Sequence, residues 1–163
     1  MKIYHGSLVV VDKPEIRISN RYLDFGNGFY TTNSFEQAKT WCNKLCSRNN
    51  CNLGYISEYE FDLDSAQNQI EIIKFSDANE QWLRFVCDNR NGVCNKNYDL
   101  VIGPVADDSV YEVVKLYELG TYELTEALKR LKVEKLYNQI LFHTKHSLEF
   151  LKFISSQESH YGN

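Results

Sequence analysis

Two short segments in the first part of the chain combine glycine with side chains that could bind a flat, polar ligand. They are Tyr4–Ser7, with the sequence YHGS, and Phe25–Thr32, with the sequence FGNGFYTT. A glycine on a strand lets a ligand approach the backbone, so Gly6 could offer its N–H and C=O to a carboxamide. His5 could bind a sugar hydroxyl, and Tyr30 could stack on a heteroaromatic ring. Taken singly, His5 could be a structural histidine and Tyr30 a half-buried aromatic residue of a strand. The order and spacing of the two motifs are what favour a ligand-binding site.

Sequence patterns of several other sites are missing. Neither G-x-G-x-x-G nor G-x-x-x-x-G-K-[ST] occurs, so a Rossmann or P-loop site has no support, and no G-x-S-x-G elbow indicates a serine hydrolase. His143 and His146 are close in sequence, as are Cys42 and Cys46, but neither pair has the further close ligands that a zinc site needs. We therefore expect no metal. The odd count of 5 cysteines, in a chain without an export signal, favours reduced thiols.

Length and composition predict one packed domain over residues 1–156, followed by a flexible C-terminal tail over 157–163. The chain has 163 residues, of which 43% are hydrophobic and 13% aromatic, which is enough for a core. The net charge of −4 argues against a basic nucleic-acid footprint over the whole chain. No apolar run reaches the roughly 18 residues of a membrane span, and Leu8–Val11 is too short for a signal peptide. We expect a cytoplasmic protein with no membrane partner.

The elements that must position these segments alternate irregularly, as in an α+β fold rather than a doubly wound sheet. β-branched and aromatic residues predict strands at Lys2–Val11, Phe29–Thr32, Gly54–Leu63, Ile70–Phe75, Tyr98–Val105 and Tyr137–Phe142. Capping residues and helical spacing predict helices that begin after Ser34, Ser76 or Asp77, Asp107, Thr121 and Thr144. The last of these helices would use Leu148, Leu151 and Ile154 as its apolar face.

In their order, these motifs resemble the H-Y-[E/Q] branch of the ADP-ribosyltransferase fold, the branch of diphtheria-toxin-like and poly(ADP-ribose)-polymerase-like enzymes. The chain is more closely similar to small bacterial domains of that fold whose function was long unknown. Those domains share Y-H-G-S, F-G-x-G-F-Y-T-T and a final Q-[IY]-x-F-x-T, which here are Tyr4–Ser7, Phe25–Thr32 and Gln139–Thr144. Trp82–Val86 and Tyr98–Asp108 also look like that group, so the resemblance covers nearly the whole chain.

The resemblance implies a split β-sheet core flanked by short helices, with NAD bound in a cleft between two small sheets. His5 would match the histidine that holds a ribose hydroxyl, and Tyr30 the tyrosine that packs on the nicotinamide ring. Gln139 would match the third catalytic position, which is normally glutamate. The NAD contacts implied on the first two motifs are His5, Gly6, Ser7, Gly28, Phe29, Tyr30 and Thr31.

The chemistry that the resemblance implies needs few groups. Nicotinamide leaves a cationic N-glycoside as a neutral molecule, so its departure needs no general acid, unlike ordinary glycoside hydrolysis. The enzyme must position NAD and stabilise oxocarbenium-like charge on the ribose. Gln139 brings no negative charge, and losing such a group typically costs about 3 kcal/mol, or roughly 10²-fold in rate. Glu134 and Asp99 are candidate helpers, and the alternative for Gln139 is an ordinary strand residue with no role in the site.

We expect an NAD-dependent ADP-ribosyltransferase that acts as a bacterial toxin of a toxin–antitoxin or phage-defence system. NAD would be its substrate, and ADP-ribose would pass to a macromolecular acceptor, for which a protein is preferred over nucleic acid. A neutralising antitoxin chain would be a further partner. Two alternatives use the same cleft: an NAD glycohydrolase, with water as the acceptor, and a non-catalytic module that binds NAD or ADP-ribose.

Overall fold

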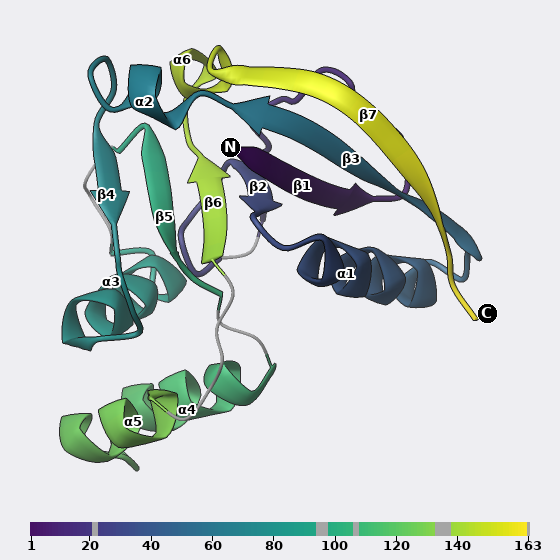
Figure 1. Ribbon diagram of the computed structural model, residues 1–163. Coiled ribbons are helices and arrows are strands. Elements are labelled where there is room, and N and C mark those ends of the chain that lie inside the picture. The colour runs from purple at the N-terminus through teal and green to yellow at the C-terminus, as the bar shows by residue number, and fades with distance from the viewer. Residues whose placement is uncertain (21–22, 94–97, 106–107, 133–137, 163) are drawn as a thin grey trace.

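The computed structural model describes residues 1–20, 23–93, 98–105, 108–132 and 138–162, and its strands pair into a seven-stranded sheet (Figure 1). The strand order is β4-β5-β6-β2-β1-β3-β7, and β4 with β5 is the parallel pair. The sheet and its helices confirm an α+β fold. The strands are β1 (Lys2–Ser7), β2 (Phe29–Thr32), β3 (Leu53–Phe61), β4 (Ile72–Lys74), β5 (Leu100–Pro104), β6 (Asn138–Phe142) and β7 (Leu151–His160).

The middle of the sheet is narrow, because the short strand β2 joins two larger groups of strands. β2 pairs with β6 along its whole length, from Phe29↔Phe142 to Thr32↔Gln139, whereas it pairs with β1 only at Tyr4↔Thr32. The strand pairing therefore differs from the two small sheets that we expected, since β2 belongs to both groups. The predicted site residues of β1, β2 and β6 lie at this junction.

The helices cover the two groups of strands separately (Figure 1). α1 packs on β1 and β3, whereas α3 lies by β4 and β5, and α4 and α5 pack against each other beyond them. The main core joins α3, α4 and α5 to the sheet, and includes Trp82, Leu83 and Val114. The helices are α1 (Phe35–Arg48), α2 (Leu63–Ala66), α3 (Glu80–Arg90), α4 (Asp108–Glu118), α5 (Leu124–Leu131) and α6 (Lys145–Leu148).

Helix capping confirms the start predicted after Ser34 and corrects the start predicted after Ser76 or Asp77. The Ser34 hydroxyl accepts a hydrogen bond from the Gln37 N–H at 3.3 Å, and α1 follows as the sequence predicts. α3 begins later than Ser76 or Asp77, because Asn79 is the capping residue and accepts from the Trp82 N–H at 3.0 Å. The tryptophan side chain is fully buried, so its packing fixes where the helix begins.

The C-terminal segment is a strand where we expected a helix and a flexible tail. α6 ends at Leu148, and β7 pairs with β3 from Phe61↔Leu151 to Leu53↔His160. Leu151 and Phe153 pack on the core, whereas Ile154 is exposed. The three-residue spacing of Leu148, Leu151 and Ile154 predicted a helix, but pairing with the long edge of β3 makes this segment a strand. Residues 157–160 belong to the same strand.

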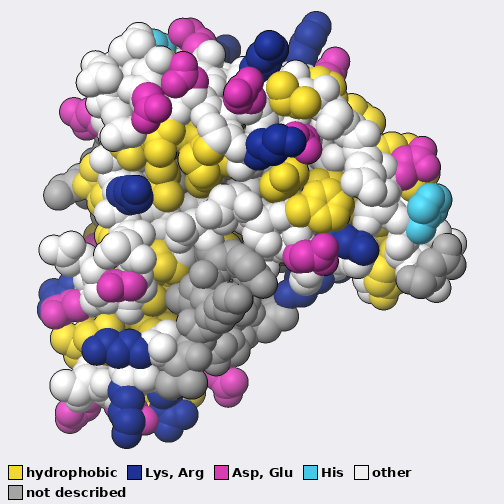
Figure 2. All heavy atoms as spheres, viewed as in Figure 1, with side chains coloured by type: hydrophobic (Ala, Val, Ile, Leu, Met, Phe, Trp, Pro, Cys, Tyr) yellow, Lys and Arg dark blue, Asp and Glu magenta, His cyan; other side chains and the backbone are white. Residues whose placement is uncertain are grey.

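The described surface carries both signs of charge. Acidic and basic side chains are interspersed over the face shown in Figure 2. Within the described ranges, no helix is both long enough and apolar enough to cross a membrane.

Candidate functional site

A cleft of about 720 Å³ lies at the junction of β1, β2 and β6. It gathers nearly all the side chains that the sequence singled out, although they come from distant parts of the chain. The lining includes His5, Gly6, Gly28, Phe29, Tyr30, Thr31 and Gln139. Ser7 is the exception among the predicted contacts, since it is not part of the described lining and its hydroxyl donates to the Val9 carbonyl at 2.6 Å.

The imidazole of His5 is held in one orientation by β2. Its Nδ1 lies 2.7 Å from the Tyr30 carbonyl oxygen, and its ring centroid lies 4.5 Å from that of Phe29. A carbonyl oxygen can only accept, so Nδ1 carries the proton of this hydrogen bond. Burial lowers the pKa of His5, the hydrogen bond to Tyr30 opposes this, and the charge of Arg17 lowers the pKa further. The ring is thus neutral at pH 7, and Nε2 is left as a hydrogen-bond acceptor.

The side chain of Tyr30 presents its ring to the cleft while its hydroxyl is bound elsewhere. The hydroxyl donates to the Gly26 carbonyl at 2.7 Å and accepts from the Phe25 N–H at 3.3 Å. Burial raises the pKa of this phenol well above its ordinary value. The hydroxyl therefore orients the ring, and what remains available to a ligand is the aromatic surface.

Gln139 is a buried amide with an open donor. It lies on β6 opposite Thr32 of β2 and Gly103 of β5, and its residue is 9% exposed. Its Nε2 is buried and has no hydrogen-bond partner among the described residues. Buried polar atoms are almost always paired in folded proteins, so an open amide in the wall of a cleft is a place for a ligand group or a water. The amide can donate, but it cannot supply a negative charge.

The two threonines of β2 fix the strand that carries Tyr30. The Thr31 hydroxyl donates to the Ile140 carbonyl and the Thr32 hydroxyl to the Asn138 carbonyl, both at 2.9 Å. Both threonines are buried. These hydrogen bonds reinforce the β2–β6 ladder and fix the positions of Tyr30 and Gln139 relative to each other.

Gly6 and Gly28 serve packing, a reason that the sequence did not reveal. A Cβ on Gly6 would lie 2.2 Å from the Ala38 carbonyl oxygen of α1. A Cβ on Gly28, where φ is +156°, would lie 2.2 Å from the Phe142 carbonyl oxygen of β6. Glycine is needed at both positions because another backbone approaches closely.

A comparison with known protein families shows which family this chain belongs to. The family model described as "Protein of unknown function (DUF3990)" matches residues 1–153. The chain belongs to this family. No curated protein and no solved structure matches it.

The described lining of the DUF3990 cleft has acidic groups other than Glu134 and Asp99, the two that the sequence suggested. Glu134 lies outside the described residues. Asp99 lies away from the described lining, and its two oxygens accept from the Glu71 N–H at 3.0 Å and the Thr144 hydroxyl at 2.7 Å, which is a structural role. The carboxylates that do line the cleft are Glu15, Asp24 and Glu118.

The sequence also missed the basic and aromatic groups of the cleft. Lys13, Arg17, Lys44, Arg90, Trp41 and Tyr111 all line it. No spacing in the sequence links the loop before β2, helix α1 and the end of α3, so no local pattern could have grouped these residues. Their presence widens the DUF3990 cleft beyond the strand motifs and makes it mixed in charge.

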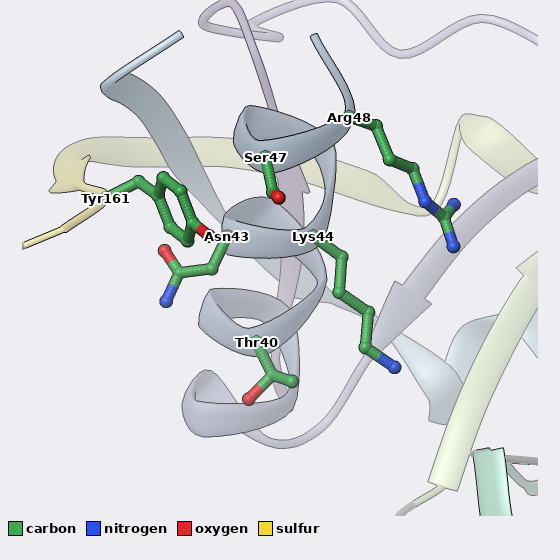
Figure 3. Close-up of a pocket in the computed structure, with 6 residues that line it drawn as sticks. All are labelled: Thr40, Asn43, Lys44, Ser47, Arg48 and Tyr161. Carbon is green, nitrogen blue, oxygen red and sulfur yellow. The ribbon is translucent and has the colours of Figure 1, made fainter. Parts of the chain in front are cut away.

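A second, smaller cavity of about 360 Å³ lies on α1 (Figure 3). It is lined by Thr40, Asn43, Lys44, Ser47 and Arg48 of the helix and by Tyr161 from beyond β7. None of the residues predicted for the site belongs to it. Its walls are mostly one helix surface, so the larger cleft remains the candidate site of this DUF3990 domain.

Within the described part of the chain, no group of three or more His, Cys, Asp or Glu side chains is arranged to hold a metal ion. Cys42, Cys46, Cys51 and Cys87 are free thiols, and Cys94 lies outside the described residues.

Proposed function

We propose that this chain is an NAD-dependent ADP-ribosyltransferase whose site is the cleft at the β1–β2–β6 junction. The observation that carries the proposal is the unpaired, buried Nε2 of Gln139 in a wall shared with the neutral imidazole of His5 and the ring of Tyr30. A donor, an acceptor and an aromatic surface in one cleft complement a ligand that has an amide, sugar hydroxyls and a flat ring. The nicotinamide riboside half of NAD has all three.

Each group has a role that its own geometry supports. His5 Nε2 accepts a hydrogen bond from a ribose hydroxyl, because Nδ1 is occupied by the Tyr30 carbonyl. The Tyr30 ring stacks on nicotinamide, and its bonded hydroxyl keeps the ring from turning. The Gln139 amide donates to an oxygen of the bound ribose. Gly6 contributes only backbone groups, since its Cα side is closed by α1.

The reaction is a substitution at the ribose C1′ carbon. The bond between C1′ and the nicotinamide nitrogen breaks, and its electron pair goes to the ring nitrogen, which becomes neutral. The acceptor nucleophile forms the new bond to C1′ and releases its proton to water. The protein positions the two reactants and places dipoles around the oxocarbenium-like ribose. An amide at position 139 stabilises that charge less than a carboxylate would, so the acceptor has to be a good nucleophile.

The acceptor that we propose is a protein, and the biological role is that of a bacterial toxin with a neutralising partner chain. The mixed charge of the cleft and the net charge of −4 favour a protein over an extended nucleic acid. Expression of the wild-type chain is then expected to arrest growth, and His5→Ala to relieve the arrest. Growth arrest by both chains would contradict this role.

A second candidate is a non-catalytic module that binds NAD or ADP-ribose, and the observation that favours it is again Gln139. A site with a neutral amide in place of a carboxylate can keep its binding contacts while losing most of its rate. Such a module would bind NAD without releasing nicotinamide.

Labelled NAD distinguishes these possibilities. Wild type is expected to release nicotinamide and to transfer label to a macromolecule in a lysate, whereas His5→Ala and Tyr30→Ala lose both activities. His146→Ala and Tyr161→Ala are matched controls, because these residues lie outside the cleft and are partly exposed. Transfer that survives both cleft substitutions would overturn the site. Nicotinamide release without a labelled acceptor would indicate a glycohydrolase, and binding without release would indicate the module.

A further inference from the structure

Arg90, the last residue of α3, lines the cleft and is a nearly buried cation whose two Nη atoms lack hydrogen-bond partners among the described residues. Its side chain is 11% exposed, and its Nε donates to Asp24 Oδ1 at 2.6 Å. Its Nη1 and Nη2 are buried and have no hydrogen-bond partner within the described part of the chain. A guanidinium has five N–H donors, so one is used here and the four on the two Nη atoms are open.

The guanidinium is held in place on two sides. Asp24 binds its Nε, and the ring of Tyr111 from α4 stacks against it, with its centroid 4.5 Å from Cζ. Both residues line the cleft together with Arg90. Asp24 and Tyr111 therefore fix the orientation of the fork without using its outer donors. Leaving four charged donors unpaired is costly in a folded protein, unless a bound group supplies the acceptors.

The charge balance of the whole cleft that Arg90 lines favours an anion. Lys13, Arg17 and Lys44 also line the cleft, and with Arg90 these basic side chains outnumber the three acidic ones. The whole chain has the opposite balance, with a net charge of −4. Because Asp24 already neutralises part of the guanidinium charge, a second acidic side chain of the protein is not needed there. A planar fork with open N–H groups matches the oxygens of a phosphate best.

Arg90 is also connected to the proposed nicotinamide end of the cleft. Asp24 directly precedes Phe25, whose N–H binds the Tyr30 hydroxyl, and the charge of Asp24 contributes to the raised pKa of Tyr30. The pair Asp24–Arg90 thus continues the wall that begins with Tyr30. A ligand with its flat ring on Tyr30 and a phosphate further along would meet both.

We propose that Arg90 binds the pyrophosphate group of the dinucleotide, with Asp24 and Tyr111 as its positioning residues. The identity of the ligand rests on the proposed function, whereas the phosphate chemistry rests on Arg90 itself. The pyrophosphate oxygens accept hydrogen bonds from Nη1 and Nη2, and no covalent bond changes. The site would make the enzyme distinguish NAD from the nicotinamide riboside that lacks phosphate.

The test measures binding by calorimetry for three ligands: NAD, nicotinamide riboside and inorganic pyrophosphate. Arg90→Gln is expected to weaken the binding of NAD and of pyrophosphate by about 30-fold or more, and to leave that of the riboside unchanged. Arg90→Lys keeps the charge but loses the fork, so it is expected to fall between wild type and Arg90→Gln. Arg84→Gln is the matched control, because Arg84 lies on the same helix, is exposed and pairs with Glu80.

Several outcomes would overturn the proposal. One is an NAD affinity that falls no further in Arg90→Gln than in Arg84→Gln. Another is unchanged NAD affinity with loss of transfer to the acceptor, which would assign Arg90 to the acceptor. If Arg90→Gln fails to fold by circular dichroism, Arg90→Lys decides by the same criteria.

Failure of the proposed function gives a different pattern. Wild type would then bind neither NAD nor the riboside. Pyrophosphate that binds wild type and Arg84→Gln, but not Arg90→Gln, would still support a phosphate site at Arg90. Absence of pyrophosphate binding to wild type would overturn that site as well.

Discussion

The polar groups of the cleft fall into two regions that differ in where their hydrogen-bond partners come from. In the first, which we call the paired wall, His5, Tyr30 and Thr31 each bind a backbone carbonyl of the protein. In the second, which we call the open donors, Gln139 Nε2 and Arg90 Nη1 and Nη2 have no partner among the described residues.

The paired wall and the open donors have different tasks in the cleft. The paired wall fixes geometry and is stable without a ligand, because its hydrogen bonds are satisfied within the fold. The open donors carry an unpaired polar group, which typically costs about 1–3 kcal/mol when it is buried. A protein keeps such groups where a bound molecule completes them, so the open donors are the better guide to function, and the paired wall to position.

The largest expected effect comes from placing a negative charge at position 139, where the open donor Gln139 is neutral. Gln139→Glu is expected to raise the rate of nicotinamide release by about 10²-fold, because a carboxylate beside the ribose stabilises positive charge in the transition state. The measurement is NAD turnover at pH 8. Gln69→Glu, at an exposed glutamine, is the control. An unchanged or lower rate would show that position 139 does not face the reacting ribose.

The two regions should respond oppositely to removal of a polar group. Gln139→Leu removes a buried donor that has no partner among the described residues, so the free energy of unfolding of the ligand-free protein is expected to rise by about 1–3 kcal/mol. Thr31→Val removes a hydroxyl that is paired with the Ile140 carbonyl and is expected to lower it by about 1 kcal/mol. Urea unfolding measures both. A loss of stability in Gln139→Leu equal to that in Thr31→Val would remove the distinction between the regions.

Tyr30 allows the positioning role and the binding role to be separated in one residue. Tyr30→Phe loses the bonds to Gly26 and Phe25 but keeps the ring, so it is expected to cost about 1 kcal/mol of stability and to leave KM for NAD nearly unchanged. Tyr30→Ala is expected to lose NAD binding as well. Thermal unfolding and initial rates are the two readouts. A rise in KM as large in Tyr30→Phe as in Tyr30→Ala would mean that the hydroxyl itself contacts the ligand.

A dependence of stability on pH is expected from two buried imidazoles, that of His5 in the paired wall and that of His143 outside it. Burial lowers the pKa of both His5 and His143 in the folded protein, so the unfolded chain binds protons first as the pH falls below about 6.5. The free energy of unfolding therefore has its full value above that pH. It decreases below that pH by at most about 1.4 kcal/mol per pH unit for each histidine. His5→Gln and His143→Gln should each flatten the slope measured by urea unfolding between pH 7.5 and 5. An unaltered slope in both variants would contradict the burial of these rings.

Much of the fold could be predicted because local patterns and tertiary structure agree. Phe29–Thr32 is a strand with the predicted bounds, and Ser34 caps α1 as predicted. β7 could not be predicted, since the spacing of Leu148, Leu151 and Ile154 fits a helix and only the free edge of β3 turns the segment into a strand. Asn79 was missed because Ser76 and Asp77 are equally good caps by sequence, and burial of Trp82 decides between them.

The site could be predicted in part, where its residues lie in local sequence patterns. His5 and Tyr30 lie in short contiguous motifs, so their types and order were visible in the sequence. Arg90 was not, because its partner Asp24 is 66 residues away and the stacking ring of Tyr111 comes from another helix. The role of Gly6 was also hidden, since only the structure shows that Ala38 of α1 occupies the space above it.

The order of the strands has a consequence for how the protein is made. β2 pairs with β6 across a long separation, 109 residues between Thr31 and Ile140, whereas β1 pairs with strands that follow it sooner in the chain. Pairing of such distant segments is slow, because a long loop must close before any contact forms. On the ribosome, His5 and Tyr30 emerge early, but the cleft lacks its floor until Gln139 has been synthesised. Under the proposed function, a nascent chain or one truncated before Gln139 would therefore lack NAD-consuming activity, and a neutralising partner could bind before the cleft is complete.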